Sequence, residues 1–301
     1  MSLLGHSSET GRSRSDDRRA CRALGLVATL FLVLPLAACY TPTVSRTRTY
    51  HPSDADLTIT RIVHGSAVID FRETRILLDP WYSPTPPLGP SEDVGLSLEN
   101  LPPMRGILIT HQHDDHFDAE TLRDYPNKEL RVIVPRGLGT TIRAMGYADV
   151  VELDQWDRSQ IGSAIVTAVP ARHDVPEDGY VLQGNGVTLY VAGDTEFDEK
   201  LFHEVAARFP EIDVALLPVG GIRSFGHRLD MSPDEAAEAY TILRPAHVIP
   251  YHYGLTGPFP FVTSASDPAK SFQTAITGAS GKHNKGVVVV LQPGESWHHY
   301  R

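Results

Sequence analysis

The segment 110–116 concentrates side chains that can bind metal ions. It reads Thr-His-Gln-His-Asp-Asp-His and directly follows an apolar run that we expect to be a buried strand. His111 and His113 are two positions apart, so in an extended chain their side chains point to the same side. Asp115 and His116 follow where the chain must turn and can face a second ion. Imidazole and carboxylate together are ligands of Zn²⁺, and also of Mn²⁺ or Fe²⁺.

Three further residues are candidates to complete this centre. His173, Asp194 and His252 each come directly after an apolar run that we expect to be a strand. Taken alone, each is more often a surface residue than a ligand. Because all of them lie at the C-terminal ends of strands, together they can form a cage around metal ions.

The order of these residues resembles that of the metallo-β-lactamase-fold hydrolases over roughly residues 57–295. The resemblance leans toward the branch of ascorbate-6-phosphate lactonase-like and N-acyl phosphatidylethanolamine phospholipase D-like proteins. It rests on His111-x-His113-x-Asp115-His116 with the three later ligands, and on four short motifs at 63–66, 78–81, 217–220 and 231–236. The fold that it implies is an α/β four-layer αββα sandwich with the site at one edge between the sheets.

The resemblance also implies how the ligands divide between two divalent ions. The first ion would take His111, His113 and His173, and the second would take Asp115, His116 and His252, with Asp194 bridging the pair. Such a pair activates water against a phosphorus or carbonyl centre. Asp115 and Asp194 are therefore the predicted catalytic residues, and Asp115 can also accept the proton of that water. The expected cofactors are two Zn²⁺ ions, with Mn²⁺ or Fe²⁺ as alternatives.

The bridging aspartate favours a particular class of substrate. True β-lactamases of this fold, as the resemblance implies, lack such a carboxylate. Asp194 thus favours a phosphodiester, a lactone or a related ester over an antibiotic. The stretch 221–228 matches the phospholipid-cleaving relatives poorly, and Asp230 stands where several relatives have histidine. The substrate is therefore a small or lipid-derived molecule whose identity the sequence leaves open.

Three more polar residues are candidates for roles around the metals. His64 and Asp79 can lie behind the ligands or face the substrate, and a purely structural role fits them equally well. His227 lies in a glycine-flanked loop that can reach the substrate. Trp81, Tyr82, Tyr253, Phe259 and Phe261 can line an apolar substrate wall or simply pack the loops.

Short apolar runs and turn signals predict the elements that position these residues. A meander of strands opens the domain, and strands alternating with helices follow. The segment 84–103 holds six prolines and must be a loop. We expect strands at 57–64, 67–71, 75–78, 105–110, 130–134, 150–153, 164–169, 187–191, 214–218, 247–251 and 286–291, and helices at 119–124, 140–145, 199–209, 233–243 and 268–276.

Composition narrows the remaining possibilities. The chain has 301 residues and a formal net charge of −10, which argues against binding nucleic acid. Two cysteines are too few for a disulfide scaffold. One domain is expected from residue 57 to residue 301.

The first residues are typical of an export signal. Arginines precede an uncharged apolar run that ends in Leu-Ala-Ala-Cys, which resembles the lipobox of bacterial lipoproteins. We therefore predict a signal peptide at 1–38, lipidation of Cys39 and a tether at 39–56. The globular part would then be anchored to a membrane of the bacterial cell envelope, outside the cytoplasm. An alternative to the hydrolase is a catalytically inactive lipoprotein of the same fold that serves in binding or assembly.

Overall fold

Two seven-stranded β-sheets form the centre of the computed structural model, which describes residues 48–279 and 286–301. The chain divides into two units, 1–38 and 39–301, and all described residues belong to the second. The predicted signal peptide and Cys39 lie outside the described residues. Among those that are described, no helix is long and apolar enough to cross a bilayer.

The first sheet combines a meander with a parallel half. Its strands β1, β2 and β3 are antiparallel, while β3, β5, β6 and β7 run parallel. In spatial order, the sheet consists of β19 (Ser296–His299), β1 (Leu57–Val63), β2 (Ser66–Phe71), β3 (Thr74–Leu78), β5 (Gly106–Leu108), β6 (Arg131–Pro135) and β7 (Val150–Leu153).

The second sheet has the same two-part design. Its strands β11, β12, β15 and β18 are parallel, and β8 to β11 pair antiparallel. In spatial order, the sheet consists of β18 (Val287–Val288), β15 (His247–Tyr251), β12 (Val214–Pro218), β11 (Val187–Val191), β10 (Asp178–Gly184), β9 (Ala164–Pro170) and β8 (Arg158–Ile161).

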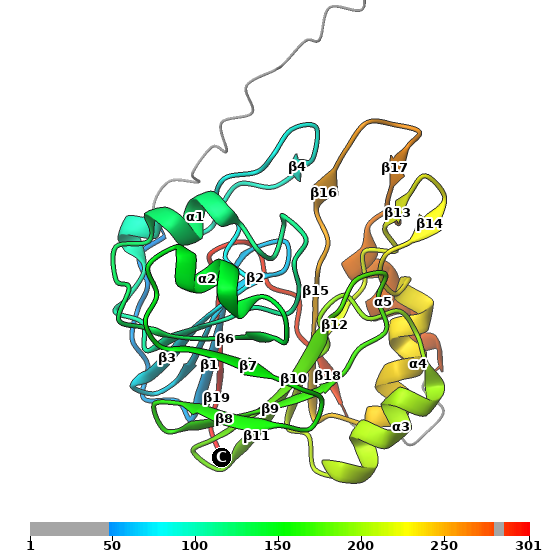
Figure 1. The fold of residues 1–301 in the computed structure, drawn as a ribbon. Coiled ribbons are helices and arrows are strands. Elements are labelled where there is room, and N and C mark those ends of the chain that lie inside the picture. Colours follow the sequence, from blue (N-terminus) through cyan, green and yellow to red (C-terminus); the bar gives the residue numbers. More distant parts are fainter. Residues whose placement is uncertain (1–47, 280–285) are drawn as a thin grey trace, which may run out of the picture. The chain divides into compact units, whose positions relative to one another are not determined.

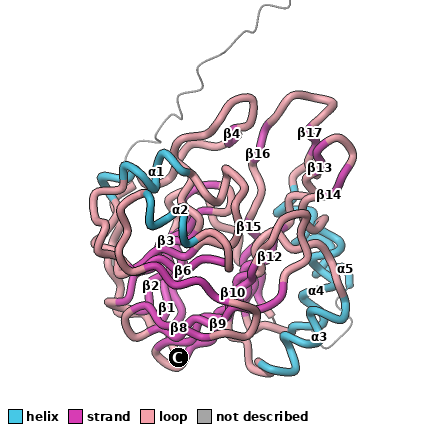
Figure 2. The backbone as a smooth tube through the Cα atoms, in the orientation of Figure 1, coloured by secondary structure: helices cyan, strands magenta, loops and turns pink. Residues whose placement is uncertain are grey.

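Helices cover the outer face of each sheet (Figures 1 and 2). One apolar cluster lies between the sheets, and two others join a sheet to its helices. The helices are α1 (Ala119–Asp124) and α2 (Gly139–Ala144) on the first sheet, and α3 (Glu199–Arg208), α4 (Pro233–Leu243) and α5 (Pro268–Ala279) on the second. The predicted αββα sandwich is therefore confirmed.

Local sequence explains where the helices begin. The Asp118 carboxylate accepts from the backbone N–H of Thr121 at the start of α1. At the start of α4, Ser232 and Glu235 form a reciprocal capping box. Helix α4 begins and ends at the predicted residues because these signals surround a clear amphipathic run.

Several elements differ from the predictions. Strands β8, β10 and β19 were not predicted, because polar residues and glycine interrupt their apolar pattern. The strand expected at 286–291 is only the two-residue β18. The loop 84–103 contains β4 (Gly89–Pro90), which pairs with β16 (Leu255–Thr256), and a 3₁₀ helix at Leu98–Asn100.

Part of the segment predicted as a tether packs against the sandwich. Tyr50 is buried, and its hydroxyl donates to the Asp70 carboxylate on β2. Ala55 is also buried, and the N–H of Asp56 donates to the carbonyl oxygen of His299 at 2.9 Å. The packed part of the chain thus begins before Leu57.

Candidate metal centre

The seven predicted metal ligands converge at one edge of the sandwich. The first sheet contributes the segment 111–116 directly after β5. The second sheet contributes His173 after β9, Asp194 after β11 and His252 after β15. The C-terminal ends of these strands lie at the same edge, so residues far apart in sequence become neighbours.

Three imidazoles form the first candidate cluster. Nδ1 of His113 lies 3.1 Å from Nε2 of His111 and 3.1 Å from Nε2 of His173. The His111 and His173 side chains are buried, whereas His113 is partly exposed. One side of this cluster is therefore open.

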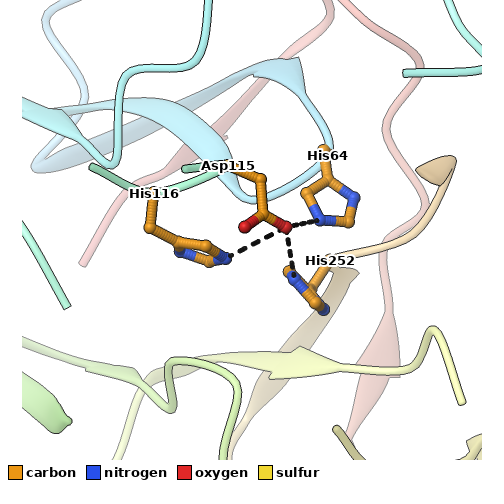
Figure 3. A group of neighbouring side chains, drawn as sticks. All are labelled: His64, Asp115, His116 and His252. Atoms are coloured by element: carbon orange, nitrogen blue, oxygen red, sulfur yellow. Dashed lines mark hydrogen bonds and ion pairs between the residues drawn. The ribbon is translucent and has the colours of Figure 1, made fainter. Parts of the chain in front are cut away.

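The second candidate cluster contains Asp115, His116 and His252, together with His64 (Figure 3). Oδ2 of Asp115 lies 3.9 Å from Nε2 of His116 and 3.7 Å from Nε2 of His252. The same oxygen lies 3.1 Å from Nε2 of His64. The structure thus places His64, whose role the sequence left open, beside the predicted ligands.

Asp194 joins the two clusters. Its Oδ2 lies 2.8 Å from Nε2 of His252 and 3.1 Å from Nε2 of His116. It also lies 3.7 Å from Nε2 of His111, which belongs to the first cluster. A carboxylate in this position has one oxygen within reach of ligands from both groups.

The donor atoms fit divalent ions. Nε2 of His116, Nε2 of His252 and Oδ1 of Asp194 are buried, and despite the short contacts of both rings with Asp194 Oδ2, none of these three atoms has a hydrogen bond of suitable geometry with the described residues. Bonds of about 2.1 Å from imidazole or carboxylate to a tetrahedral ion would separate the donors by roughly 3.4 Å. The separations of 2.8 to 3.9 Å between the Oδ2 atoms of Asp115 and Asp194 and Nε2 of His116 or His252 lie around that value.

A carboxylate stands behind each of three histidines. Oδ2 of Asp79 lies 2.8 Å from Nδ1 of His116, and Oδ2 of Asp230 lies 3.0 Å from Nδ1 of His252. Oε1 of Glu177 lies 3.3 Å from Nδ1 of His111. Such partners accept the Nδ1 proton and turn Nε2 toward the metal.

Only one of these three carboxylates was predicted from the sequence to lie behind a metal ligand. Asp79 was a candidate, but Glu177 and Asp230 were not. Asp230 was noted only as a departure from the family pattern. Glu177 precedes β10 and Asp230 precedes α4, and both are far in sequence from the histidines that they contact, so no local spacing indicated them.

Burial and charge act on the site in opposite directions. Burial lowers the pKa of His111 to about 3 and the pKa of His64 to about 4, which keeps both imidazoles neutral. Burial also lowers the pKa of His116 and His252, but Asp194 and the other carboxylates around them together outweigh burial and hold both pKa values well above the usual range. Divalent ions would replace these protons on binding.

Burial is also the main influence on the pKa values of Glu177 and Asp230. Burial, together with Asp194, raises the pKa of Glu177 to about 8. Burial raises the pKa of Asp230 to about 6, although its contact with His252 opposes the change. By contrast, the pKa of Asp194 lies well below its usual range, because His116 and His252 outweigh its burial.

The backbone is strained at three of these residues. His64, Asp79 and His252 have φ values of +50°, +40° and +55°. Such left-handed conformations cost non-glycine residues on the order of 1–3 kcal/mol each, and they cluster at functional sites. Gly220 is required for space, since a Cβ there would lie 2.5 Å from the His252 carbonyl oxygen.

A cavity of about 560 Å³ opens onto the centre. His113, Asp115, Asp194 and His252 line it, and so does His227, the predicted substrate-facing histidine. None of the five aromatic residues considered for a substrate wall is part of the lining among the described residues. Trp81 and Tyr253 are instead buried, where they pack the loops.

Comparisons with known proteins agree with this geometry. Residues 74–253 match the family model described as a beta-lactamase superfamily domain. The chain is 32% identical over 250 residues to a UPF0173 metal-dependent hydrolase of Pyrococcus furiosus, covering 79% of this chain and 97% of the relative. It is 30% identical over 258 residues to a UPF0173 metal-dependent hydrolase of Koribacter versatilis, covering 80% of this chain and 97% of that relative.

Solved structures share the fold at low sequence identity. Igni18, a metallo hydrolase from Ignicoccus hospitalis, superposes with a TM-score of 0.63 at 21% identity and covers 80% of this chain and 97% of its own. CmlA, a diiron beta-hydroxylase from Streptomyces venezuelae, has a TM-score of 0.64 at 22% identity. The match covers 82% of this chain and 55% of CmlA. With the metal-binding geometry and the family match, the chain belongs to the beta-lactamase superfamily and, within it, to the UPF0173 metal-dependent hydrolases.

Proposed function

We propose that this metal-dependent hydrolase uses two divalent ions to cleave a phosphodiester, a lactone or a related ester. The observation that carries the proposal is the position of Asp194. Its Oδ2 lies within 3.7 Å of His111 in the first cluster and within 3.1 Å of His116 in the second. A single carboxylate that reaches both clusters suits a pair of ions that share a ligand.

The chain's own residues can position the reaction. Bound divalent ions would activate water and stabilise the negative charge that develops on the substrate. Asp115 lines the cavity with a partly exposed carboxylate, so its oxygen that does not face a metal ion can accept a proton. Asp79 and Asp230 hold His116 and His252 in the tautomer that leaves Nε2 free.

The donor set favours Zn²⁺, with Mn²⁺ or Fe²⁺ as alternatives. The seven predicted ligands supply imidazole and carboxylate groups and no thiolate. Zn²⁺ accepts this combination readily, and open dinuclear centres of the same ligands also hold Mn²⁺ or Fe²⁺.

We also infer that the protein acts at the bacterial cell envelope. The support is the sequence alone: an arginine-rich start, an apolar run and Leu-Ala-Ala-Cys ending at Cys39. A lipid on Cys39 would hold the sandwich at a membrane outside the cytoplasm.

Hydrolysis assays on the purified full chain test the catalytic proposal. Bis(4-nitrophenyl) phosphate and γ-butyrolactone serve as substrates, with Zn²⁺ or Mn²⁺ supplied. We expect turnover of at least one substrate, and a loss of at least about 100-fold in Asp115→Ala and in Asp194→Ala. His203→Ala is the matched control, because His203 is exposed on α3, outside the cavity lining. Full activity in both aspartate variants would contradict the proposal.

A further inference from the structure

The cavity beside the metal centre has two kinds of wall. One consists of predicted metal ligands. The rest includes five apolar side chains, Leu88, Ile222, Phe225, Leu229 and Leu255. A volume of about 560 Å³ lies within the range of small-molecule sites. The reacting group would occupy only the part next to the ligands, so the apolar part is free to hold the remainder of a substrate.

Phe225 is the most exposed of these apolar residues. It lies between β13 (Arg223–Ser224) and β14 (His227–Arg228), and its side chain is 73% exposed. Its ring centroid lies 5.2 Å from that of Phe261. Large exposed apolar groups beside a cavity are typical of ligand-binding sites.

The backbone holds this aromatic pair in place. The N–H of Phe225 donates to the carbonyl oxygen of Phe261 at 2.7 Å. Strand β13 also pairs with β17 (Val262–Thr263), and together with β14 they form a small three-stranded sheet. Figure 1 shows this sheet beside β16, at the end of the sandwich where the loops gather. The position of Phe225 at the cavity is therefore fixed by backbone hydrogen bonds.

The charges of the cavity exclude an anionic ligand arm. Among the described residues, no lysine or arginine lines it. Asp114 and Asp174 add two carboxylates beyond the predicted metal ligands. An anionic group outside the metal centre would therefore meet like charge, and among the described lining residues beyond the predicted ligands only the His227 imidazole could oppose it, without the lysine or arginine that recognises carboxylate or phosphate.

We propose that this cavity binds the non-reacting arm of the substrate, and that this arm is apolar and carries no negative charge. The inference rests on the proposed function, because the same cavity exposes the predicted metal ligands. An ester or lactone with an alkyl or aryl substituent fits it, whereas a sugar phosphate or nucleotide does not. Burial of each added methylene should improve binding by up to about fourfold.

Binding of an uncharged probe tests the arm site without requiring turnover. Dansyl amides with butyl, hexyl and octyl chains are titrated into the full chain, and dansyl fluorescence is recorded. We expect affinity to rise with chain length and to fall at least about fivefold in Phe225→Ser. In the metal-free chain, where no cation can bind its carboxylate, octanoate should displace the octyl probe at least about tenfold less well than octanol. Equal competition by octanoate would overturn the proposal.

Phe259 provides a matched control. It is 83% exposed and belongs to the loop that precedes β17, but it does not line the cavity. Phe259→Ser should leave probe binding unchanged. Two results would overturn the proposal and indicate that these residues contact a membrane surface. The first is that Phe259→Ser and Phe225→Ser weaken probe binding equally. The second is that either substitution weakens probe binding only when phosphatidylcholine vesicles are present.

A catalytic series separates this inference from the proposed function. With γ-lactones carrying alkyl arms of two to eight carbons, kcat/KM should rise with length in the wild type and stay flat in Phe225→Ser. Absence of turnover of both these lactones and bis(4-nitrophenyl) phosphate, with chain-length-dependent probe binding, would contradict the proposed function alone. Turnover that is insensitive to arm length, together with length-independent probe binding, would contradict the arm site alone.

Discussion

Nε2 of His64 lies 3.1 Å from Oδ2 of Asp115, while Nδ1 of the same ring lies 3.2 Å from the carbonyl oxygen of Tyr253. A carbonyl oxygen only accepts, so Nδ1 carries the proton of the neutral ring. Burial keeps that ring neutral by lowering its pKa to about 4. His64 therefore turns a lone pair toward a carboxylate, an arrangement that a nearby cation would stabilise.

This relationship predicts the effect of changing His64. In His64→Ala, the second cluster should lose about 10- to 100-fold in metal affinity, because a lone pair that can face the same cation as the Asp115 carboxylate is removed. Isothermal titration calorimetry of the metal-free chain with Zn²⁺ measures this loss of affinity. The first cluster, which His64 does not contact, should keep its affinity. Unchanged affinity at both sites would show that His64 only fills space.

A second prediction concerns the tautomer of His252. Asp230→Asn keeps the shape of the side chain, but the N–H of Ile222 already donates to Oδ1, so the amide oxygen would stay there and the NH2 group would face Nδ1 of His252. Nε2 should then carry the proton and bind metal poorly, so metal affinity and kcat should fall by about 10- to 100-fold. Metal-dependent protection against thermal unfolding and steady-state kinetics measure the two effects. Wild-type values for both would contradict the assigned role of Asp230.

A third prediction concerns the pH dependence of stability. Burial, with Glu177 nearby, raises the pKa of Asp178 to about 7, and Oδ2 of Asp178 has no hydrogen-bond partner among the described residues. The folded state thus holds this proton more tightly than the unfolded state. The free energy of unfolding should therefore fall as pH rises from about 4 to 7.

Asp178→Asn should remove this decrease of stability with rising pH, because the amide does not titrate. At pH 8 we expect the free energy of unfolding of the variant to exceed that of the wild type by about 1–3 kcal/mol, which is the cost of an unsatisfied buried polar group. Near pH 4.5 the two should differ little. Urea unfolding of the metal-loaded proteins at both pH values gives the comparison, and an identical difference at both would exclude titration of Asp178 as the cause.

The predicted lipid anchor has an independent test. Cys39→Ser removes the thiol that would carry the lipid, so the protein should move from the membrane fraction to the soluble fraction of bacterial cells. Immunoblots of fractionated cells measure the distribution, with Cys21→Ser as the matched control. Retention of the Cys39 variant on membranes would refute lipidation at this residue.

The sequence predicted the fold well where local patterns were strong. Strands β7, β11, β12 and β15 and helices α1 and α4 begin and end at the predicted residues, since apolar runs and caps mark their boundaries. Strand β8 has the sequence Arg-Ser-Gln-Ile, which carries little apolar signal. It is held by an antiparallel hairpin with β9 through the turn at Gly162 and Ser163, so backbone pairing stabilises a strand whose own side chains carry no apolar alternation.

The candidate site divides in the same way. The ligands after β5 were visible because four donors lie within six residues of one segment. Glu177 and Asp230 were not, because each acts on a histidine that is distant in sequence. Their proximity depends on the path of loops, such as the turn at Gly220, that no periodicity describes.

The metal content of the purified full chain tests the central claim most directly. After loading with Zn²⁺ and removal of free metal, mass spectrometry of the metal in the wild type and in Asp194→Ala gives the number of ions per chain. We predict two ions in the wild type and fewer in the variant, whose shared carboxylate is gone. Two ions in both proteins would contradict the shared role of Asp194, and no bound ion in the wild type would contradict the dinuclear centre itself.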